Sequence, residues 1–303
     1  MSVVVFGSLN LDIVLRLPAR AAWGETLLVD TQATHVGGKG LNQAIAAARF
    51  GSVTAMTGAT GDDPAGAALR DALATEGVAT DGVAVLEGAP SGRATILVEP
   101  GGDNMIAVEA GANMQARAGA LPLADVRVIL AQLETDIDET CALFARPGAA
   151  AAHKIINLAP ALTGGERFFD LADTLIFNQT EFATYLALDR EPQALEDLLV
   201  VRERLTRPGQ AAVVTLGAAG AVAVWADRAL VSPSFPAPAI VDTAGAGDCF
   251  CGVLAAAIDQ GLGIEAAMRF ANAAASLSVR KAGAAPSMPS RDSVEAILIG
   301  TRR

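Results

Sequence analysis

The chain has 303 residues, 52% of them apolar, and carries a formal net charge of −11 at pH 7. So acidic a chain cannot track a phosphate backbone by charge, and we expect no nucleic-acid partner. Glycine, proline or charge interrupts every apolar run before it reaches about 18 residues, so no membrane-spanning helix is predicted. The start MSVVVFGSLN has no basic segment, and only three cysteines occur. We therefore expect a cytoplasmic protein without a signal peptide or a disulfide framework.

In chain order, short apolar runs alternate with alanine-rich segments at helical spacing. The runs at 3–9, 53–59, 126–133, 154–160, 173–178 and 212–217 are typical of buried parallel strands. Helical spacing occurs at 44–51, 66–77, 138–148, 180–188 and 195–205, and again after Asp248. This alternation predicts an α/β fold with a parallel sheet and helices on both faces.

Two segments break the alternation, because each is typical of two strands joined by a turn. The expected strands are IVLRL and TLLVD in the first segment, and ATILV and MIAV in the second. Four such strands predict a small separate sheet, which needs a ligand or a second subunit to cover one of its faces. We therefore expect a core of residues 1–11, 32–90 and 111–303 and a lid of residues 12–31 and 91–110.

The motif GSLNLD (7–12) ends the first expected strand. In open α/β sheets ligands bind beyond the carboxyl ends of the strands. Asn10 and Asp12 would offer an amide and a carboxylate there, which suit a ligand rich in hydroxyl groups. A simple Asx turn leaving the strand is the alternative. A dinucleotide-binding enzyme would carry GxGxxG at this point, and the motif is absent.

The motif GGKGLNQ (37–43) precedes a helix. Its glycines allow the backbone to approach a ligand closely, and Lys39 and Asn42 would point toward that ligand. Lys39 is one of three lysines among 22 basic residues, which favours a functional role over a solvated loop position. A Walker A loop would need Ser or Thr after the lysine, and Gly40 stands there.

Two further strand ends carry polar or glycine-rich turns. In NQTE (178–181), Asn178 and Glu181 are three residues apart at a helix start, so both can face one crevice. The same pair is also typical of a capping box, which would be purely structural. In TLGAAG (215–220), the glycines would admit a nucleotide close to the backbone.

The motif DTAGAGD (242–248) combines a glycine-rich turn with an acid. Gly245, Ala246 and Gly247 would direct backbone N–H groups at a phosphate from a helix N-terminus. Asp248 would then accept the proton of a hydroxyl group that attacks the phosphate, a role that a positioned weak base can fill. The structural alternative is that Asp248 is only an N-cap.

Taken together in order and spacing, GSLNLD, GGKGLNQA, QLE (132–134), NQTE, TLGAAG, DTAGAGD and KAGAAPS (281–287) resemble the ribokinases of the PfkB carbohydrate-kinase family. The resemblance covers about residues 3 to 298. It implies a ribokinase-like three-layer α/β/α sandwich with a mainly parallel central sheet and a small β-sheet lid. It also implies ATP-dependent transfer of the γ-phosphoryl group to the primary (5-) hydroxyl of ribose or a close pentose, with Mg²⁺ and K⁺ as cofactors. A homodimer through the lid is expected as well.

The resemblance also assigns roles by position. Sugar contacts fall on Asn10, Asp12, Gly38, Lys39, Asn42 and Glu134; the base is Asp248, and the anion hole is formed by Gly245, Ala246 and Gly247. Nucleotide contacts fall on Asn178, Thr215, Gly217, Gly220 and Asn272, and Asn178 and Glu181 would organise Mg²⁺ through water. A monovalent cation would have the carbonyls of Asp242, Ala244, Ser278, Lys281 and Gly283 and the Ser287 hydroxyl as ligands.

Two positions depart from the family pattern, and both affect the choice of sugar. Trp23 replaces a proline before the expected second lid strand, and Arg93 stands where a small or apolar residue is usual. A nucleoside kinase is a second hypothesis. It is disfavoured because such an enzyme would stack the base on apolar or aromatic lid residues, whereas aromatic residues make up only 4% of the chain and Trp23 is the only one in the lid. Another small-sugar kinase of the family also stays open. A sugar-binding regulator would be expected to lack Asp248.

Overall fold

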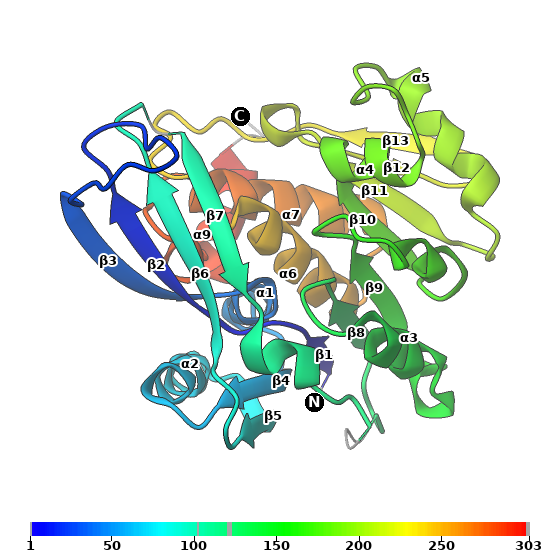
Figure 1. The fold of residues 1–303 in the computed structure, drawn as a ribbon. Coiled ribbons are helices and arrows are strands. Elements are labelled where there is room, and N and C mark those ends of the chain that lie inside the picture. The colour runs from blue at the N-terminus through cyan, green and yellow to red at the C-terminus, as the bar shows by residue number, and fades with distance from the viewer. Residues whose placement is uncertain (1, 102, 120–122, 301–303) are drawn as a thin grey trace.

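The computed structural model describes residues 2–101, 103–119 and 123–300, and its core is a nine-stranded sheet (Figure 1). The strand order is β13-β12-β11-β10-β9-β8-β1-β4-β5. The seven strands from β11 to β5 run parallel, and β12 pairs antiparallel with both β11 and β13. The strands are β1 (Val3–Phe6), β4 (Thr54–Gly61), β5 (Ala79–Leu86), β8 (Val128–Ala131), β9 (His153–Asn157), β10 (Thr174–Asn178), β11 (Ala211–Thr215), β12 (Ala221–Val224) and β13 (Ala229–Ser232).

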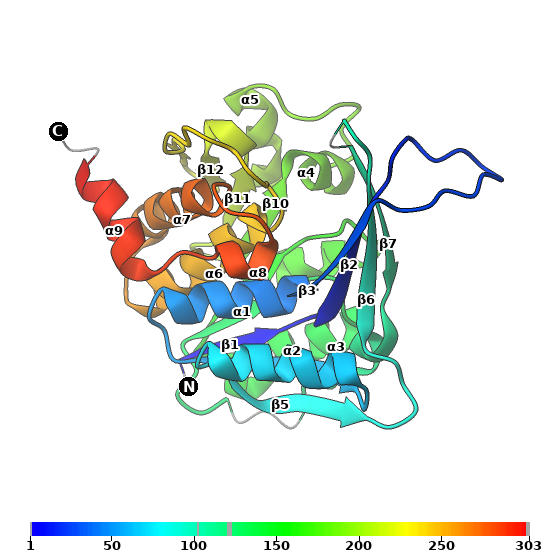
Figure 2. The ribbon, with the colours of Figure 1, turned by 90° about the vertical axis from the view of Figure 1, so that its left-hand side faces the viewer.

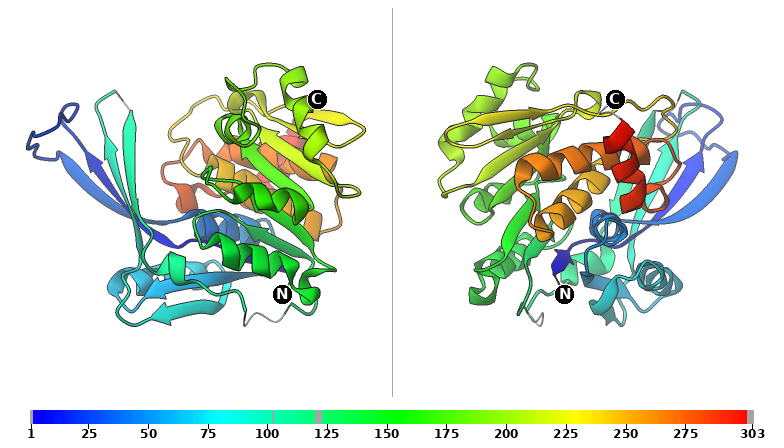
Figure 3. Two further views of the ribbon diagram at one scale, coloured as in Figure 1. Left: turned by 45° about the vertical axis from the view of Figure 1, so that its right-hand side comes forward. Right: turned by 180° about the vertical axis from the view of Figure 1, so that it is seen from behind.

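Helices cover both faces of this sheet, as the sequence predicts. Along β1, Val3 and Val5 join one buried cluster and Val4 and Phe6 the other, so the strand is apolar on both faces. The first cluster packs α1 (Lys39–Arg49), α2 (Pro64–Thr75), α6 (Ala246–Asp259), α7 (Ile264–Ser278) and α9 (Arg291–Gly300). The second packs α3 (Ile137–Ala145), α4 (Gln179–Tyr185) and α5 (Leu195–Leu198). The two views of Figure 3 each bring a different helical layer toward the viewer.

Shorter helices complete the chain. They are α8 (Ala284–Ser287) and the 3₁₀ helices η1 (Gly111–Gln115), η2 (Pro147–Ala149), η3 (Gly165–Asp170), η4 (Leu199–Arg204) and η5 (Gly217–Ala219). The helical spacing predicted at 195–205 corresponds to two consecutive helices, because a single α-helical turn, α5, passes directly into η4. In the described part of the chain, no helix combines the length and apolar character needed to cross a bilayer.

A second sheet of four strands stands away from the large one (Figures 2 and 3). Its order is β3-β2-β6-β7, built from β2 (Asn10–Arg16), β3 (Thr31–Gly37), β6 (Gly92–Val98) and β7 (Asn104–Glu109). β2 and β6 pair in parallel, and the outer pairs are antiparallel. Gly102, between β6 and β7, lies outside the described residues, as do the chain ends assigned to the core.

The expected lid strand TLLVD (26–30) is wrong. β2 pairs instead with residues 31–37, and residues 17–30 form a long projecting loop (Figure 2). TLLVD has the apolar content of a strand but not its burial, since Leu28 is 87% exposed. β3 escapes prediction because TQATHVG is polar. We propose that the lid comprises residues 10–37 and 92–109.

Candidate active site

The carboxyl ends of the parallel strands bring the predicted residues together. Asn10 begins β2 just beyond β1, Glu134 follows β8, Asn178 ends β10 and Thr215 ends β11. Because β1, β8, β9, β10 and β11 are neighbours in the sheet, residues far apart in the sequence meet at one edge. α1 and α6 begin at the same edge and contribute Lys39 and Asp248.

One side of the site lies under the lid. A cavity of about 540 Å³ is lined by Asn10, Glu134 and Asn113, with Val108 of β7 above them. Asn10 is 4% exposed, and its Oδ1 accepts a hydrogen bond of 2.8 Å from Asn113 Nδ2. Asn113 in turn accepts from the Leu9 backbone N–H through Oδ1 at 2.9 Å. Asn113 therefore fixes the Asn10 amide, and no sequence motif singled it out.

Glu134 links two of the predicted motifs. Its Oε2 accepts hydrogen bonds from the Ser8 hydroxyl and, at 3.2 Å, from the Lys39 backbone N–H. The carboxylate thus holds the start of α1 against the end of β1. Ser8 belongs to GSLNLD but was not predicted to take part.

Asp12 sits among like charges. Burial, followed by the charges of Glu134 and Asp248, raises the pKa of Asp12 to about 7. A carboxyl group in this state can both accept and donate hydrogen bonds near neutral pH. Asp12 is therefore suited to bind a hydroxyl group, which is itself both a hydrogen-bond donor and an acceptor.

Lys39 is the positive centre of the site. Burial opposes the charge on its ammonium group, but the carboxylates of Asp248, Glu134 and Glu181 outweigh burial and raise the pKa of Lys39. Lys39 therefore remains a cation at physiological pH. Its position among three acids suits a group that binds a phosphate or a sugar oxygen.

Asp248 lies in the first turn of α6 and is 8% exposed. Gly245, with φ of 76°, is the N-cap residue of this helix, so the interpretation of Asp248 as a simple N-cap is wrong. Its Oδ2 accepts a hydrogen bond of 3.0 Å from Asn42 Nδ2, and its Oδ1 accepts one of 2.9 Å from Gln43 Nε2. The predicted sugar contact Asn42 thus holds Asp248, and Gln43 was not predicted at all.

A second cavity, of about 130 Å³, joins the predicted catalytic and nucleotide residues. Its lining includes Lys39, Asp248, Gly245 and Gly247 on one side and Asn178, Glu181 and Thr215 on the other. The first N–H groups of a helix lack intrahelical partners, so the start of α6 offers donors and a partial positive charge to an anion in this cavity. The arrangement brings a carboxylate, an ammonium group and an anion-binding helix start together.

Asn178 and Glu181 form the capping box that the sequence allowed. Asn178 Oδ1 accepts from the Glu181 N–H at 2.7 Å, and Glu181 Oε2 accepts from the Asn178 N–H at 2.8 Å. Burial raises the pKa of Glu181, against the opposing effects of the Asn178 hydrogen bond and the Lys39 charge. The capping role does not exclude a second one, because both residues also line the cavity.

The other predicted nucleotide residues are Thr215 at the end of β11, Gly217 and Gly220 in the turn before β12, and Asn272 in α7 (Ile264–Ser278). A Cβ on Gly220 would overlap with the Ser232 carbonyl, and Asn272 Nδ2 donates to that same carbonyl at 2.9 Å. The absence of a side chain at Gly220 therefore allows the end of β13 to approach closely, and Asn272 holds it by a hydrogen bond. Gly217, with φ of 55°, begins η5 in the turn between β11 and β12. Of this group, Thr215 is the one that lines the cavity beside Asp248.

The segments predicted to hold a monovalent cation also meet. Asp242 accepts from the Ala244 N–H through Oδ1 and from the Gly283 N–H through Oδ2, both at 2.9 Å. The Ser287 hydroxyl donates to the Ala284 carbonyl. The Ser278 hydroxyl donates to Ala275 O, and Lys281 Nζ donates to Pro286 O. Asp242 thus brings residues 242–245 and 281–287 together at the start of α6.

Trp23 and Arg93 lie away from the sugar side of the lid. Trp23 is fully exposed in the loop between β2 and β3. Arg93 lies opposite Leu11 and Glu109 in the sheet, whereas Asp12 lies opposite Ala94. Since successive residues of a strand point to opposite faces, Arg93 and Asp12 are on different faces of the lid. Within one chain, neither Trp23 nor Arg93 reaches the Asp12 side.

Comparison with known proteins identifies the family of the chain. The profile of pfkB family carbohydrate kinases matches residues 1–291. The chain is 36% identical to the ribokinase of Bacillus subtilis over 98% of its own length and 99% of that protein. It is 35% identical to the bifunctional ribokinase/ribose-5-phosphate isomerase A of Fructilactobacillus sanfranciscensis, but spans 55% of that longer protein. The structure of Arabidopsis thaliana ribokinase complexed with ribose and ATP superposes with a TM-score of 0.88 at 30% identity, with 98% of each chain covered.

The protein belongs to the pfkB family of carbohydrate kinases. Its fold is the ribokinase-like α/β fold that the sequence predicted, with a large, mainly parallel sheet and a smaller second sheet.

Proposed function

We propose that the protein transfers the γ-phosphoryl group of ATP to the 5-hydroxyl group of ribose. The observation that carries the proposal is the position of Asp248. Its carboxylate lies at the start of α6, in one cavity with Lys39 and Glu181, and its charge also acts on Asp12 of the lid. A hydroxyl group held by the lid residues and a phosphate held by the helix start would meet at this carboxylate.

The reaction follows from this placement. The sugar hydroxyl oxygen attacks the γ-phosphorus as the bond to the β,γ-bridging oxygen breaks, and Asp248 accepts the hydroxyl proton. ADP leaves with the bonding electron pair. The turn at 245–248 is the proposed anion hole, although the Ala246 N–H already donates to the Thr243 carbonyl at 3.3 Å. The N–H groups of Gly247 and Asp248 and the Lys39 ammonium group would stabilise the charge on the transferring group. A loose transition state needs little activation of the nucleophile, so a carboxylate suffices as the base.

The sugar contacts proposed are Asn10, Asp12, Gly38, Lys39, Asn42 and Glu134. Asn10 and Asp12 enter from the lid, and Lys39 and Asn42 enter from α1. Gly38, with φ of 91°, lies against the backbone of Ser8 and Asn10, and a Cβ there would overlap with both. A site of paired polar groups penalises an analogue that lacks a hydroxyl, because its partners are left unsatisfied.

Mg²⁺ fits the cavity beside α4. The ion keeps several waters and is usually held by one or two carboxylates and the substrate phosphates. Glu181 is a buried carboxylate whose Oε2 is used by Asn178, so its other oxygen can hold a water of the ion. When bound, Mg²⁺ would neutralise phosphate charge.

We also propose K⁺ near residues 242–245 and 281–287, a dimer formed through the lid, and a cytoplasmic location.

The test is ADP release with ribose, 2-deoxyribose, fructose, adenosine and pseudouridine as acceptors. We expect ribose to have the highest kcat/KM and to exceed 2-deoxyribose by at least about tenfold, or ~1.4 kcal/mol. A preference for adenosine or pseudouridine would identify a nucleoside kinase and overturn the ribose assignment. ADP release with none of them, in a folded protein that binds ribose, would favour a non-catalytic sugar-binding protein.

A further inference from the structure

Gln43 is fully buried, and every polar atom of its side chain has a partner. Its Nε2 donates to Asp248 Oδ1 at 2.9 Å and to Asn157 Oδ1 at 3.2 Å, and its Oε1 accepts from Gln132 Nε2 at 2.6 Å. Gln43 can therefore offer nothing to a substrate. It connects the carboxyl ends of β8 and β9 to the carboxylate on α6.

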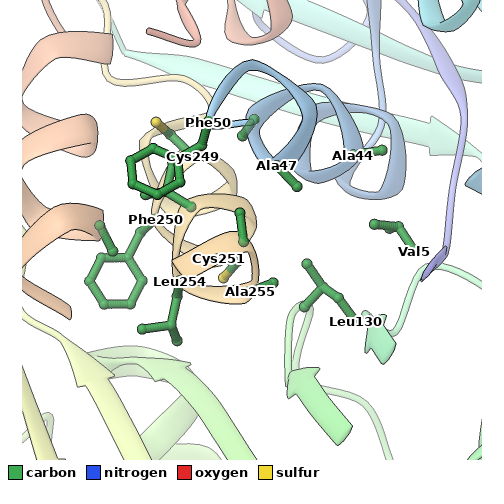
Figure 4. Close-up of a cluster of buried hydrophobic side chains, with 14 of the residues drawn as sticks. Val5, Ala44, Ala47, Phe50, Leu130, Cys249, Phe250, Cys251, Leu254 and Ala255 are labelled. Carbon is green, nitrogen blue, oxygen red and sulfur yellow. The ribbon is translucent and has the colours of Figure 1, made fainter. Parts of the chain in front are cut away.

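The spacing on both helices explains why these groups meet. Lys39 and Gln43 are four residues apart on α1, and Asp248 and Gly252 are four apart on α6, so each pair shares one helix face. A Cβ on Gly252 would overlap with the Gln43 carbonyl and stand 2.7 Å from Ala46 Cβ. Gly252 thus lets the helices approach closely, and Asp248 then lies one turn away, beside Gln43. Figure 4 shows Ala44 and Ala47 of α1 and Cys249 and Cys251 of α6 in the same buried cluster.

At the far end of the network, Gln132 donates to Gln43 through Nε2, while its Oε1 has no hydrogen-bond partner and is held by packing. Gln132 is fully buried and follows β8, and a Cβ on Gly7 would overlap with its Oε1. The amide of Gln132 is therefore packed directly on the end of β1. Gln43 is held from behind by Gln132 and from the side by Asn157, so its Nε2 has one orientation toward Asp248.

We propose that Gln43 is a positioning residue that sets the orientation of the Asp248 carboxylate through the buried amides of Gln132 and Asn157. The inference rests on the proposed role of Asp248 as the base. With Asn42 on Oδ2 and Gln43 on Oδ1, rotation of the carboxylate is restricted, and its remaining lone pairs are directed to one place. Both donors are neutral amides, so they orient the base without pairing it with a charge.

The functional consequence is specific. A carboxylate that loses a hydrogen-bond donor holds its proton more tightly, and a base that can rotate meets the substrate hydroxyl less often. Loss of the Gln43 amide should therefore lower kcat and move the acidic limb of the kcat–pH profile to higher pH. The other groups whose charges act on or with Asp248 are Lys39, Glu181, Asp12, Glu134, Cys249 and Cys251. All of these groups are unchanged in the glutamine variants below. A difference between the kcat–pH profiles of wild type and the Gln43 variant therefore reports on Gln43.

The experiment compares Gln43→Met with Gln210→Met. Gln210 is 2% exposed, and its amide is hydrogen-bonded to Phe169 O, Ala172 O and the Thr206 N–H, at the opposite end of β11 from the site. Both variants remove a buried, fully bonded amide of similar size. For Gln43→Met we expect kcat at pH 7 to fall at least about tenfold, with KM for ribose and ATP within about threefold of wild type. The acidic limb should rise by at least about 0.5 pH unit. Gln210→Met should lower the melting temperature and leave kcat and the acidic limb unchanged.

Gln132→Met provides a second variant that keeps the direct contact to Asp248. We expect a smaller loss of kcat with the same direction of pH shift, even if Gln43→Met does not fold. An unmoved acidic limb in the folded variants would overturn the proposal and leave Gln43 a packing residue. Asp248→Asn separates the two claims: if it keeps more than about a third of wild-type kcat, Asp248 is not the base, whatever Gln43 does. If Asp248→Asn is inactive and the Gln43 and Gln132 variants match wild type, only the positioning role is wrong.

Discussion

Gly37 of β3 lies beside the Asp12 side chain of β2, and a methyl group on Gly37 would overlap with the Asp12 carboxylate. Asp12 pairs with His35 in the sheet, so Gly37 is its diagonal neighbour on the same face. The missing side chain at position 37 is what leaves room for the carboxylate in its present position. The glycine of the GGKG motif therefore has a steric role toward the lid, separate from any contact with a ligand.

We predict that Gly37→Ala raises KM for ribose at least about tenfold while KM for ATP changes less than about twofold. The new methyl group must displace the Asp12 carboxylate, which is the free end of a side chain, so the fold should tolerate the change. Steady-state kinetics with each substrate varied in turn provide the measurement. Gly148→Ala is a suitable control, because a Cβ there makes ordinary contacts with Leu123. Equal KM values in the two variants would show that Gly37 does not control Asp12.

Asp12 should reduce stability at alkaline pH. Its pKa of about 7 in the folded protein lies above its ordinary value of 3.8, so between these values the folded state holds a proton that the unfolded state has released. The free energy of unfolding then falls as the pH rises through this window. Asp12→Asn is neutral at every pH, and we predict that it melts about 2 °C or more above wild type at pH 8.5. The difference should be smaller at pH 5.

Thermal unfolding at both pH values measures this effect. The same substitution should weaken ribose binding although it stabilises the fold. The amide keeps the shape of Asp12 but cannot provide its charge or its proton, so KM for ribose should rise. A variant that is less stable than wild type at pH 8.5 would show that Asp12 carries its charge without penalty. Such a result would contradict the crowding of Asp12 by Glu134 and Asp248.

The sequence predicted the strands that are apolar on both faces and the polar residues that follow them. β1, β8 and β10 fall within predicted runs, and β9 and β11 each begin one residue before theirs. Asn10, Glu134, Asn178 and Thr215 lie where the parallel sheet requires. β3 was missed because its burial pattern is mostly exposed, so pairing with β2 rather than hydrophobicity forms this strand. The TLLVD segment was mistaken for this strand because its central residues are apolar, although it is mostly exposed and belongs to none of the strands that the structure describes.

The amide network around Asp248 was beyond local sequence reasoning. Gln43 and Gln132 each belong to a recognised motif, yet they are 89 residues apart, and their contact depends on the order of strands in the sheet. The contact between Gln43 and Asp248 depends further on the close approach of two helices at Gly252. Asn113 has no motif of its own. Such contacts follow from packing, which spacing along one chain does not encode.

Glu181 offers a test of the proposed Mg²⁺ site that is independent of the base. Glu181→Gln keeps the side-chain shape and the hydrogen bond to the Asn178 N–H but removes the charge. We predict that the Mg²⁺ concentration for half-maximal activity rises about tenfold, since an oxygen-ligated cation loses a carboxylate. The melting temperature should change little, because a charge at a helix start contributes about 0.3–1 kcal/mol.

Asp197→Asn is the matched control for this variant. Asp197 is likewise the third residue after an N-cap, that of α5, and its Oδ2 accepts from the N-cap Ala194 N–H in an exposed part of the chain. Loss of the Asp197 charge in this variant should leave the Mg²⁺ dependence of the activity unchanged. An unaltered Mg²⁺ requirement in Glu181→Gln, with normal ATP binding, would reduce Glu181 to a capping residue.

The lid should bring two subunits together. All six residues of β7 are exposed, and Met105, Ile106 and Val108 are 66%, 55% and 55% exposed. A small sheet that leaves this much apolar surface in water is typical of an interface. We predict a sedimentation mass near twice the 30.7 kDa of one chain at micromolar concentration. A mass near that of one chain would contradict the dimer.

Two variants can show which face of β7 forms the interface. Ile106 lies opposite Ile96 and Met105 opposite Leu97, so the two side chains point to different faces of the lid. Met105→Glu and Ile106→Glu each place a charge on one face, and the variant on the buried face should shift the dimer toward monomer. Val231→Glu is the control, because Val231 is 55% exposed on the edge strand β13 of the large sheet. If Val231→Glu alone produced monomers, the contact would lie at that edge of the core and the lid would serve only to cover the sugar.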